Sequence, residues 1–132
     1  MSERYSFDYA IVRLVPHTER EEFINVGVIL SCQSADFLQA IFEVDAKRLR
    51  ALAPRLDIEE IQAHLEAISL ICAGGERAGP IGRLPRRARF DWLVAPRSTI
   101  IQTSAVHTGL CSEPRKALEH LLRKMVSAPL EA

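Results

Sequence analysis

The chain lacks an excess of charge of either sign, because 17 Lys and Arg residues balance 17 Asp and Glu residues. Proteins that bind nucleic acids or membrane surfaces normally carry a basic excess, so this balance argues against both classes. Long apolar runs are also missing, since none approaches the roughly 20 residues that a membrane-spanning helix needs. No apolar segment of the kind found in a signal peptide follows the first residues. The sequence therefore predicts a cytoplasmic protein with no membrane association.

Cysteine is scarce, and Cys32, Cys72 and Cys111 are far apart in the sequence. Zinc sites and redox motifs need closer spacing, so we expect free thiols in a reducing compartment, with no disulfide, metal or cofactor. The rest of the composition, 48% apolar and 26% charged, is that of an ordinary globular protein. A length of 132 residues predicts a single domain that spans residues 1–132.

Apolar patterns predict three strands early in the chain, at residues 5–15, 23–32 and 37–44. Their short polar connections favour an antiparallel meander. The first strand is apolar on both faces, which is typical of a central strand. The second contains Gly27, and a glycine inside a strand indicates a bulge or a close approach to the backbone. Two further strands are predicted at residues 89–94 and 99–103.

Helix signals occupy much of the remainder. One short helix follows the capping residue Asp45, a second follows Asp57, and a third begins at Glu113 and Pro114. Residues 74–88 and 104–112 are predicted loops. The last helix has an apolar stripe that we expect to be buried, formed by Leu118, Leu121, Leu122, Met125 and Val126. The order predicts an α+β fold, with a mostly antiparallel sheet of about five strands and helices packed on one face.

Several segments, in this order, resemble one bacterial family, known only as domain of unknown function 3037. They are Tyr9 to Arg13 with Pro16, Glu22 to Val28, Arg48 to Pro54, Gly79 to Gly82, Phe90 to Ser98, and His107 to Cys111. The resemblance covers nearly the whole chain. It implies a small intracellular bacterial protein, and it implies a partner, because such proteins are often encoded beside a HipA-like protein with a kinase-type fold. It supplies no catalytic residues.

Arg13 interrupts an apolar pattern, so its charge must find a partner or reach solvent. An ion pair with Glu19, Glu21 or Glu22 is the favoured interpretation, and a cleft that binds phosphate or carboxylate is the alternative. Arg97 and Ser98 occupy a predicted turn, where they either close the turn or bind an anion.

His107 and Cys111 suggest a thiol nucleophile with a histidine base, but no third residue orients them. His107 is better interpreted as a loop anchor. A different cluster, the loop around residues 77–89, holds an excess of arginine and is either solvated or a docking surface for an acidic partner. Its arginines are Arg77, Arg83, Arg86, Arg87 and Arg89.

No constellation here forces a reaction, so the sequence predicts a non-enzymatic binding or regulatory module that acts with a protein partner, such as the HipA-like protein. Nucleic acid is not an expected partner. The alternative is a small phosphate- or nucleotide-handling enzyme with one anion-binding pocket. That pocket would combine Arg13, Glu22, Asn25, Arg97, Ser98 and His107.

Overall fold

The computed structural model describes residues 4–128. Its sheet has the strand order β3-β2-β1-β4, and β5 also pairs with β1. All the pairings are antiparallel, so the predicted meander and the sheet of about five strands are confirmed. The strands are β1 (Tyr5–Leu14), β2 (Ile24–Cys32), β3 (Phe37–Phe42), β4 (Ile101–Thr103) and β5 (His107–Cys111).

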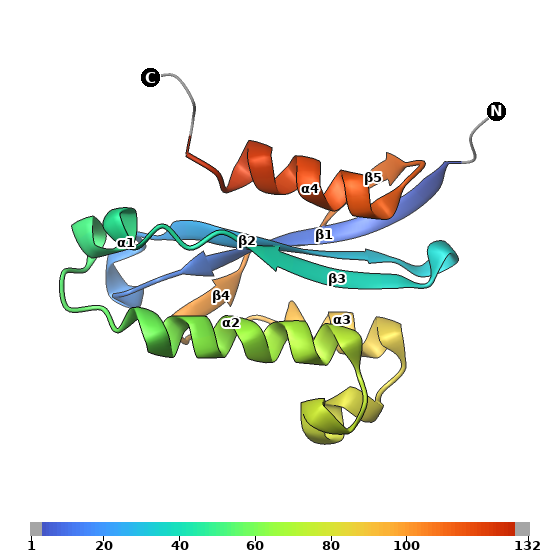
Figure 1. The fold of residues 1–132 in the computed structure, drawn as a ribbon, viewed down its shortest axis with the longest axis horizontal. Helices are drawn as coiled ribbons and strands as arrows, with labels where there is room; N and C mark the ends of the chain where they lie inside the picture. Colours follow the sequence, from blue (N-terminus) through green and yellow to red (C-terminus); the bar gives the residue numbers. More distant parts are fainter. Residues whose placement is uncertain (1–3, 129–132) are drawn as a thin grey trace.

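The helices lie on both faces of this sheet (Figure 1), with α4 on one side and α2 and α3 on the other. They are α1 (Ala46–Leu52), α2 (Ile58–Ala73), α3 (Arg86–Leu93) and α4 (Pro114–Met125), with short 3-10 segments η1 (Thr18–Arg20), η2 (Gln33–Ala35) and η3 (Glu76–Arg83). The α+β class is therefore confirmed.

The placement of the helices differs from the prediction of helices on one face. Leu14 and Ile29 pack under α2 and α3, whereas Val28 and Leu30 pack under α4. Both β1 and β2 are apolar on two faces, and each face needs a cover to remove its side chains from water. The expected stripe of α4 is buried at Leu118, Leu121 and Val126, against the sheet and not against α2, whereas Leu122 and Met125 are only half-buried.

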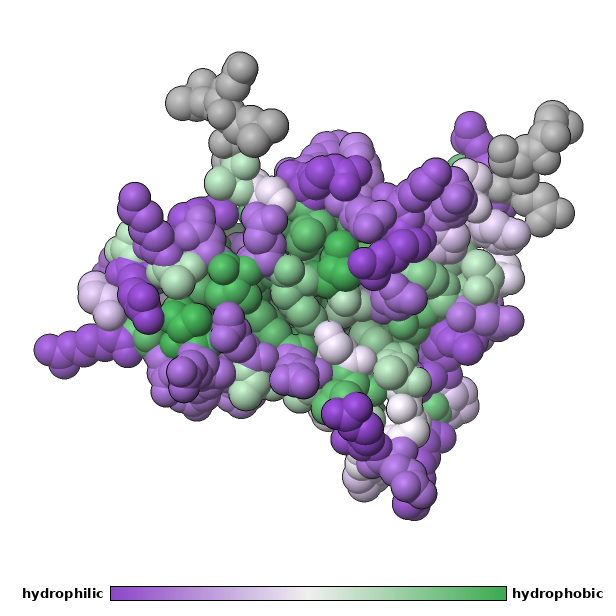
Figure 2. Space-filling view, in the orientation of Figure 1, coloured by the Kyte–Doolittle hydropathy of each residue, from purple (hydrophilic) through white to green (hydrophobic). Residues whose placement is uncertain are grey.

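The edge at β3 shows how the two helical layers meet the sheet. Figure 2 shows an apolar band along β3, between the hydrophilic outer surfaces of α4 and α2. Both helices contact β3, and its apolar side chains are buried or half-buried. The helices therefore contact β3 from both faces of the sheet.

The predicted helix starts are confirmed by their caps. The Asp45 carboxylate accepts hydrogen bonds from the amides of Lys47 and Arg48, at 3.1 and 3.2 Å. Asp57 accepts one from the amide of Glu60 at 3.2 Å. Side-chain acceptors at these positions replace partners that the first turn of a helix lacks. Local chemistry thus sets where α1 and α2 begin.

The strand predicted at residues 89–94 is wrong, because this segment belongs to α3. Its alternation of charged and apolar residues imitates a strand. In the structure Arg89, Phe90 and Leu93 are buried together on one side of a helix. The predicted loop at residues 104–112 is also wrong in part, because it contains β5, which β1 completes by long-range pairing.

Gly27 lies beside a bulge in β2, as its position in the strand predicted. Val12 pairs with Gly27 and Arg13 pairs with Asn25, so Val26 is an extra residue without a partner on β1. A Cβ atom on Gly27 would lie 2.2 Å from Cδ1 of Phe42 and 2.8 Å from the carbonyl oxygen of Ile41. Glycine is required here because β3 packs directly against its backbone.

Candidate functional site

Asn25 and Arg13 occupy paired positions on the side of the sheet that α4 covers. Asn25 donates from Nδ2 to the carbonyl oxygen of Met125 at 3.0 Å, and Arg48 donates to that of Val126 at 3.3 Å. Donors and positive charge at the end of a helix satisfy its free carbonyls and its dipole. Asn25 therefore anchors the last turn of α4 to the sheet.

The ion pair predicted for Arg13 is not present among residues 4–128. Its guanidinium instead lies 4.2 Å from the ring centroid of Phe23, in a cation–π contact. Glu22 pairs with Arg20, which lowers the pKa of the Glu22 carboxyl. Arg13 Nε and Asn25 Oδ1 are buried without a hydrogen-bond partner in the described part of the chain. These two residues are the part of the six-residue hypothesis that the structure places together.

Arg97 lies on the opposite side of the sheet, after the end of α3. Its guanidinium donates to the carbonyl oxygens of Leu93, at 3.0 Å, and of Trp92. It also stacks on the Trp92 ring, with 4.3 Å between the guanidinium carbon and the ring centroid. Ser98 follows as an exposed residue. Arg97 therefore closes α3 while its remaining N–H groups stay available.

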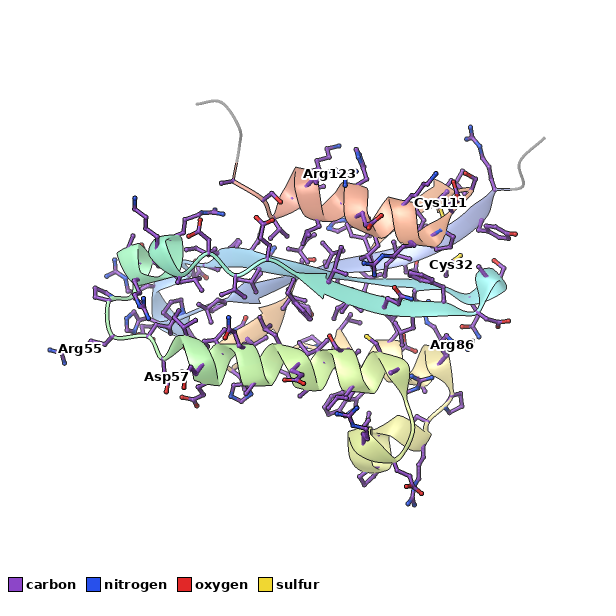
Figure 3. All side chains as sticks on the ribbon, in the orientation of Figure 1. Cys32, Arg55, Asp57, Arg86, Cys111 and Arg123 are labelled. Atoms are coloured by element: carbon purple, nitrogen blue, oxygen red, sulfur yellow. The ribbon has the colours of Figure 1, made fainter. Side chains whose placement is uncertain are left out.

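His107 and Cys111 do not form a nucleophile and its base. They are four residues apart on β5, which separates their Cα atoms by roughly 13 Å. His107 stacks on Tyr9, with ring centroids 5.5 Å apart. Burial, and then the nearby Cys32 thiol, raises the pKa of the Cys111 thiol, which opposes thiolate formation. Figure 3 shows Cys32 and Cys111 between α4 and the sheet.

The three thiols are free in the structure. Cys32 and Cys111 lie on β2 and β5, the strands that flank the start of β1, and the Cys32 thiol donates to the carbonyl oxygen of Ser6 at 3.6 Å. Burial raises the pKa of Cys72 to about 12. Within residues 4–128, no cluster of three His, Cys, Asp or Glu side chains could hold a metal ion. Over the same range, none of the helices has the length and apolar character needed to cross a membrane.

The six residues of the predicted pocket therefore lie at separate places. Arg13 and Asn25 are on the α4 side, Arg97 is on the side of α2 and α3, and the sheet separates them. Glu22 is exposed in the loop before β2 and engages Arg20. The geometry gives no support to one catalytic pocket built from all six.

The arginine-rich segment is only partly a surface feature. Arg89 is 8% exposed, and it donates to the carbonyl oxygens of Leu84 at 3.0 Å, Ile71 at 2.8 Å and Cys72 at 2.6 Å. Two of these carbonyls belong to the last turn of α2, where no helical amide remains to satisfy them. Arg89 is therefore a buried connector of α2, α3 and η3 and cannot reach a partner.

Two further arginines hold α3 against the sheet. Arg86 lies 3.2 Å from Asp36 in the turn after β2 (Figure 3). Arg87 lies 2.6 Å from Asp8 of β1 and 3.0 Å from Asp91. The hydrogen bond from Arg87, together with one from Thr108, lowers the pKa of Asp8 against the opposing effect of burial. Arg77 and Arg83 are exposed, and of the five they alone have no ion pair or side-chain hydrogen bond in the described chain.

The sheet edge formed by β4 and β5 has a different character. β4 pairs with the end of β1 and β5 with its start, so the two are halves of one interrupted edge strand. Between them, Ser104 stays attached to β1: its amide donates to the carbonyl oxygen of Ile11 at 2.8 Å, and its hydroxyl accepts from the Ile11 amide at 2.9 Å. The outer backbone of this strand faces away from the sheet.

This edge combines exposed apolar side chains with hollows in the surface. Leu110 is 64% exposed and Val106 is 42% exposed. Three hollows border the strand: one of about 200 Å³ against α2 and α3, one of about 330 Å³ beside Val106, and one of about 340 Å³ between β5 and α4. The sequence contains a signal for this surface, although no motif marks it. From Ser98 to Ser112 it has no Asp, Glu, Lys or Arg, whereas exposed edge strands usually carry charge.

A family model described as a protein of unknown function, DUF3037, matches residues 9–126. The chain belongs to the DUF3037 family. The match runs from β1 to the end of α4, so it includes both layers of helices and the β4–β5 edge. The family suggested by the sequence motifs is therefore confirmed. No curated protein and no solved structure matches this DUF3037 chain.

Proposed function

We propose that this DUF3037 protein is a non-enzymatic binding module that recognises a protein partner by strand pairing at the β4–β5 edge. An extended segment of the partner would hydrogen-bond to the outer backbone of this edge, as in other complexes formed by strand addition. The expected partner is a HipA-like protein with a kinase-type fold, which is the neighbour implied for this family.

One observation carries the proposal: the β4–β5 edge has no Asp, Glu, Lys or Arg, and β5 exposes His107, Thr108 and Leu110 while β4 is half-buried. Edge strands of monomeric proteins are normally protected by charge, proline or an overlying element, because unprotected edges pair with other chains. The opposite edge strand, β3, contacts α2 and α4 on its two faces, and its apolar side chains are buried or half-buried. Leu110 is more exposed than any other large apolar side chain in the described structure, and it lies on the unprotected edge.

A second feature supports fast association with an acidic partner. Arg77 and Arg83 are exposed, while the other three arginines of the segment are engaged within the protein. Exposed charges contribute only about 0–1 kcal/mol each, and they act mainly on the association rate. Reversal of both to Glu should slow association at low salt and have a smaller effect at high salt. Equal rates for this double variant and the wild type at every salt concentration would exclude a docking role for the segment.

The test of the proposed edge compares matched charge insertions at the two sides of the sheet. Leu110→Lys places a charge on β5, and Gln39→Lys places the same charge on the exposed position of β3. Affinity for a purified HipA-like protein of the same genome would be measured by calorimetry. Leu110→Lys should weaken binding about tenfold or more, which corresponds to 1.4 kcal/mol. Gln39→Lys should bind like the wild type.

Two outcomes contradict the proposal. If Leu110→Lys binds like the wild type, the partner does not use the β5 edge. If Gln39→Lys alone weakens binding, the partner pairs with β3 instead. Circular dichroism of both variants would establish that each keeps the wild-type fold before affinities are compared.

A further inference from the structure

The smallest of the three hollows lies between α2, the end of α3 and β4, and it has an apolar floor. On α2 it is lined by His64, Ala67, Ile68 and Ile71, which share one side of the helix by their spacing. Leu93 and Ile101 complete the floor from α3 and β4. The volume of about 200 Å³ is below the 300–1,000 Å³ typical of small-molecule sites, so the hollow has room for about one apolar side chain.

The lining of this hollow carries positive charge that is held in place. Arg97 lines it, and the guanidinium is restrained by the Trp92 ring and by two carbonyl oxygens of α3. A guanidinium has five N–H donors, so most remain available to a ligand. No Asp or Glu is among the lining residues. The chemical complement is an apolar group with a carboxylate next to it.

The location of the hollow connects it to the unprotected edge. Ile101, Gln102 and Thr103 form β4, and all three line the hollow. Arg97, Gln102 and Thr103 also line the neighbouring hollow of about 330 Å³ beside Val106. An extended segment that lies along β4 would thus pass both hollows and Arg97, which lines both of them. The residues of such a segment that point to the side of the first hollow would be every second one.

We infer that the hollow between α2, α3 and β4 anchors an apolar side chain of an extended acidic segment of the partner, whose adjacent carboxylate pairs with Arg97. This inference rests on the proposed function and specifies the chemistry of the segment that is recognised. Trp92, the single tryptophan of the chain, is 40% exposed and forms the aromatic wall, a role typical of residues that dominate binding interfaces.

The test uses a fragment that combines the two groups, so that it does not depend on the partner. The probe is 4-methylpentanoate, which carries a leucine-like apolar end and a carboxylate. Its neutral control is 4-methylpentanamide, and its cationic control is 3-methylbutylamine. Binding to the full chain would be followed by amide chemical shifts in ¹H–¹⁵N NMR spectra. Shifts should concentrate at Ala67, Ile71 and residues 101–103, and the carboxylate should bind about three- to fivefold tighter than the amide, as an exposed ion pair allows.

Two variants separate the apolar floor from the charge. Ala67→Phe places a ring in the hollow from an exposed helical position and should abolish binding of all three fragments. Arg97→Gln should leave the acid and the amide with equal affinity, and Arg97→Lys should restore part of the preference. Wild-type spectra away from the hollow would show that each variant is folded.

Several results would overturn the inference: no shifts at fragment solubility, binding unaffected by Ala67→Phe, or no preference for the carboxylate. Different results would contradict the proposed function. Leu110→Lys should bind the fragment like the wild type, because Leu110 does not line this hollow. If the fragment binds but Leu110→Lys leaves partner affinity unchanged, the edge proposal is wrong. If Leu110→Lys weakens the partner but the fragment does not bind, only the anchor hollow is wrong.

Discussion

Replacement of Arg89 by alanine should destabilise the fold more than any change to its neighbouring arginines. Each of its three hydrogen bonds joins a charged donor to a backbone carbonyl, at 2.6–3.0 Å. Such bonds contribute about 1.5–3 kcal/mol each, or roughly 5–9 kcal/mol in sum. In the variant, water that reaches the last turn of α2 would hydrogen-bond to the freed carbonyls and offset part of this loss of stability. A net loss of about 3–5 kcal/mol is therefore expected, which is a large fraction of a typical stability of about 5–15 kcal/mol.

The assay is urea denaturation followed by circular dichroism, with Arg83→Ala as the matched control. Arg83 is in the same segment but exposed, so its replacement should change the free energy of unfolding by less than about 0.5 kcal/mol. Arg89→Lys keeps the charge but offers a single donor group, so its stability should lie between those of Arg89→Ala and the wild type. The slope with urea should stay constant across the three variants.

The interpretation of Arg89 as a connector is refuted if the free energies of unfolding of Arg89→Ala and Arg83→Ala differ by less than about 1 kcal/mol. Such a difference would be smaller than the loss of one charged hydrogen bond. It is also refuted if Arg89→Lys is as stable as the wild type, because the forked geometry of the guanidinium would then be unnecessary. Either result would return Arg89 to the group of surface arginines predicted from the sequence.

Three further predictions concern other parts of the sheet. Gly27→Ala should cost about 1–3 kcal/mol by overpacking, and Phe42→Leu should recover part of this in a double-mutant cycle; additive effects would contradict the contact. The Asp8 carboxyl has a pKa below its ordinary value of 3.8, so it stabilises the fold above that pH and this stability is lost as the pH falls further. Asp8→Asn should therefore be less stable than the wild type at pH 6, with the gap closing below pH 4, the region of the ordinary carboxyl pKa; a gap that does not depend on pH would exclude this linkage. Leu121→Ala should cost about 2–5 kcal/mol in thermal unfolding, and an unchanged melting temperature would contradict its burial between α4 and the sheet.

The proposed binding surface shows how much of a site the sequence motifs of this chain predict. The polar residues Asn25, Arg89 and Arg97 have side chains that could bind a ligand or a partner, yet in the structure they bind backbone carbonyls at helix ends. Helix ends from distant parts of the sequence become neighbours only after folding, so these partners could not be read from spacing. The uncharged stretch from Ser98 to Ser112 was visible in the sequence, but its meaning depends on its place at an exposed edge.

Local rules were sufficient for features whose partners lie within a few residues. Asp45 and Asp57 start helices by bonding to amides two or three positions away, and the alternation in β1, β2 and β3 with short turns specified their antiparallel order. Gly27 also marked the close approach of β3 beside the bulge, because a side chain at this position would meet Phe42 and the carbonyl oxygen of Ile41. These features depend on the local backbone geometry, which the residues of each segment determine by themselves.

The tertiary structure decided the features whose partners are distant. Residues 89–94 have an alternation that suits a strand, but burial of Phe90 and the bonds of Arg89 to α2 favour the helix α3. β5 has little strand pattern of its own and exists because β1 supplies its hydrogen bonds. The sequence by itself determined which segments could be helices or strands and that β1 needed cover on two faces. Which helix covers each face, and which edge is left open, was decided by the packing of the complete chain, because burial of apolar surface is a property of the whole fold.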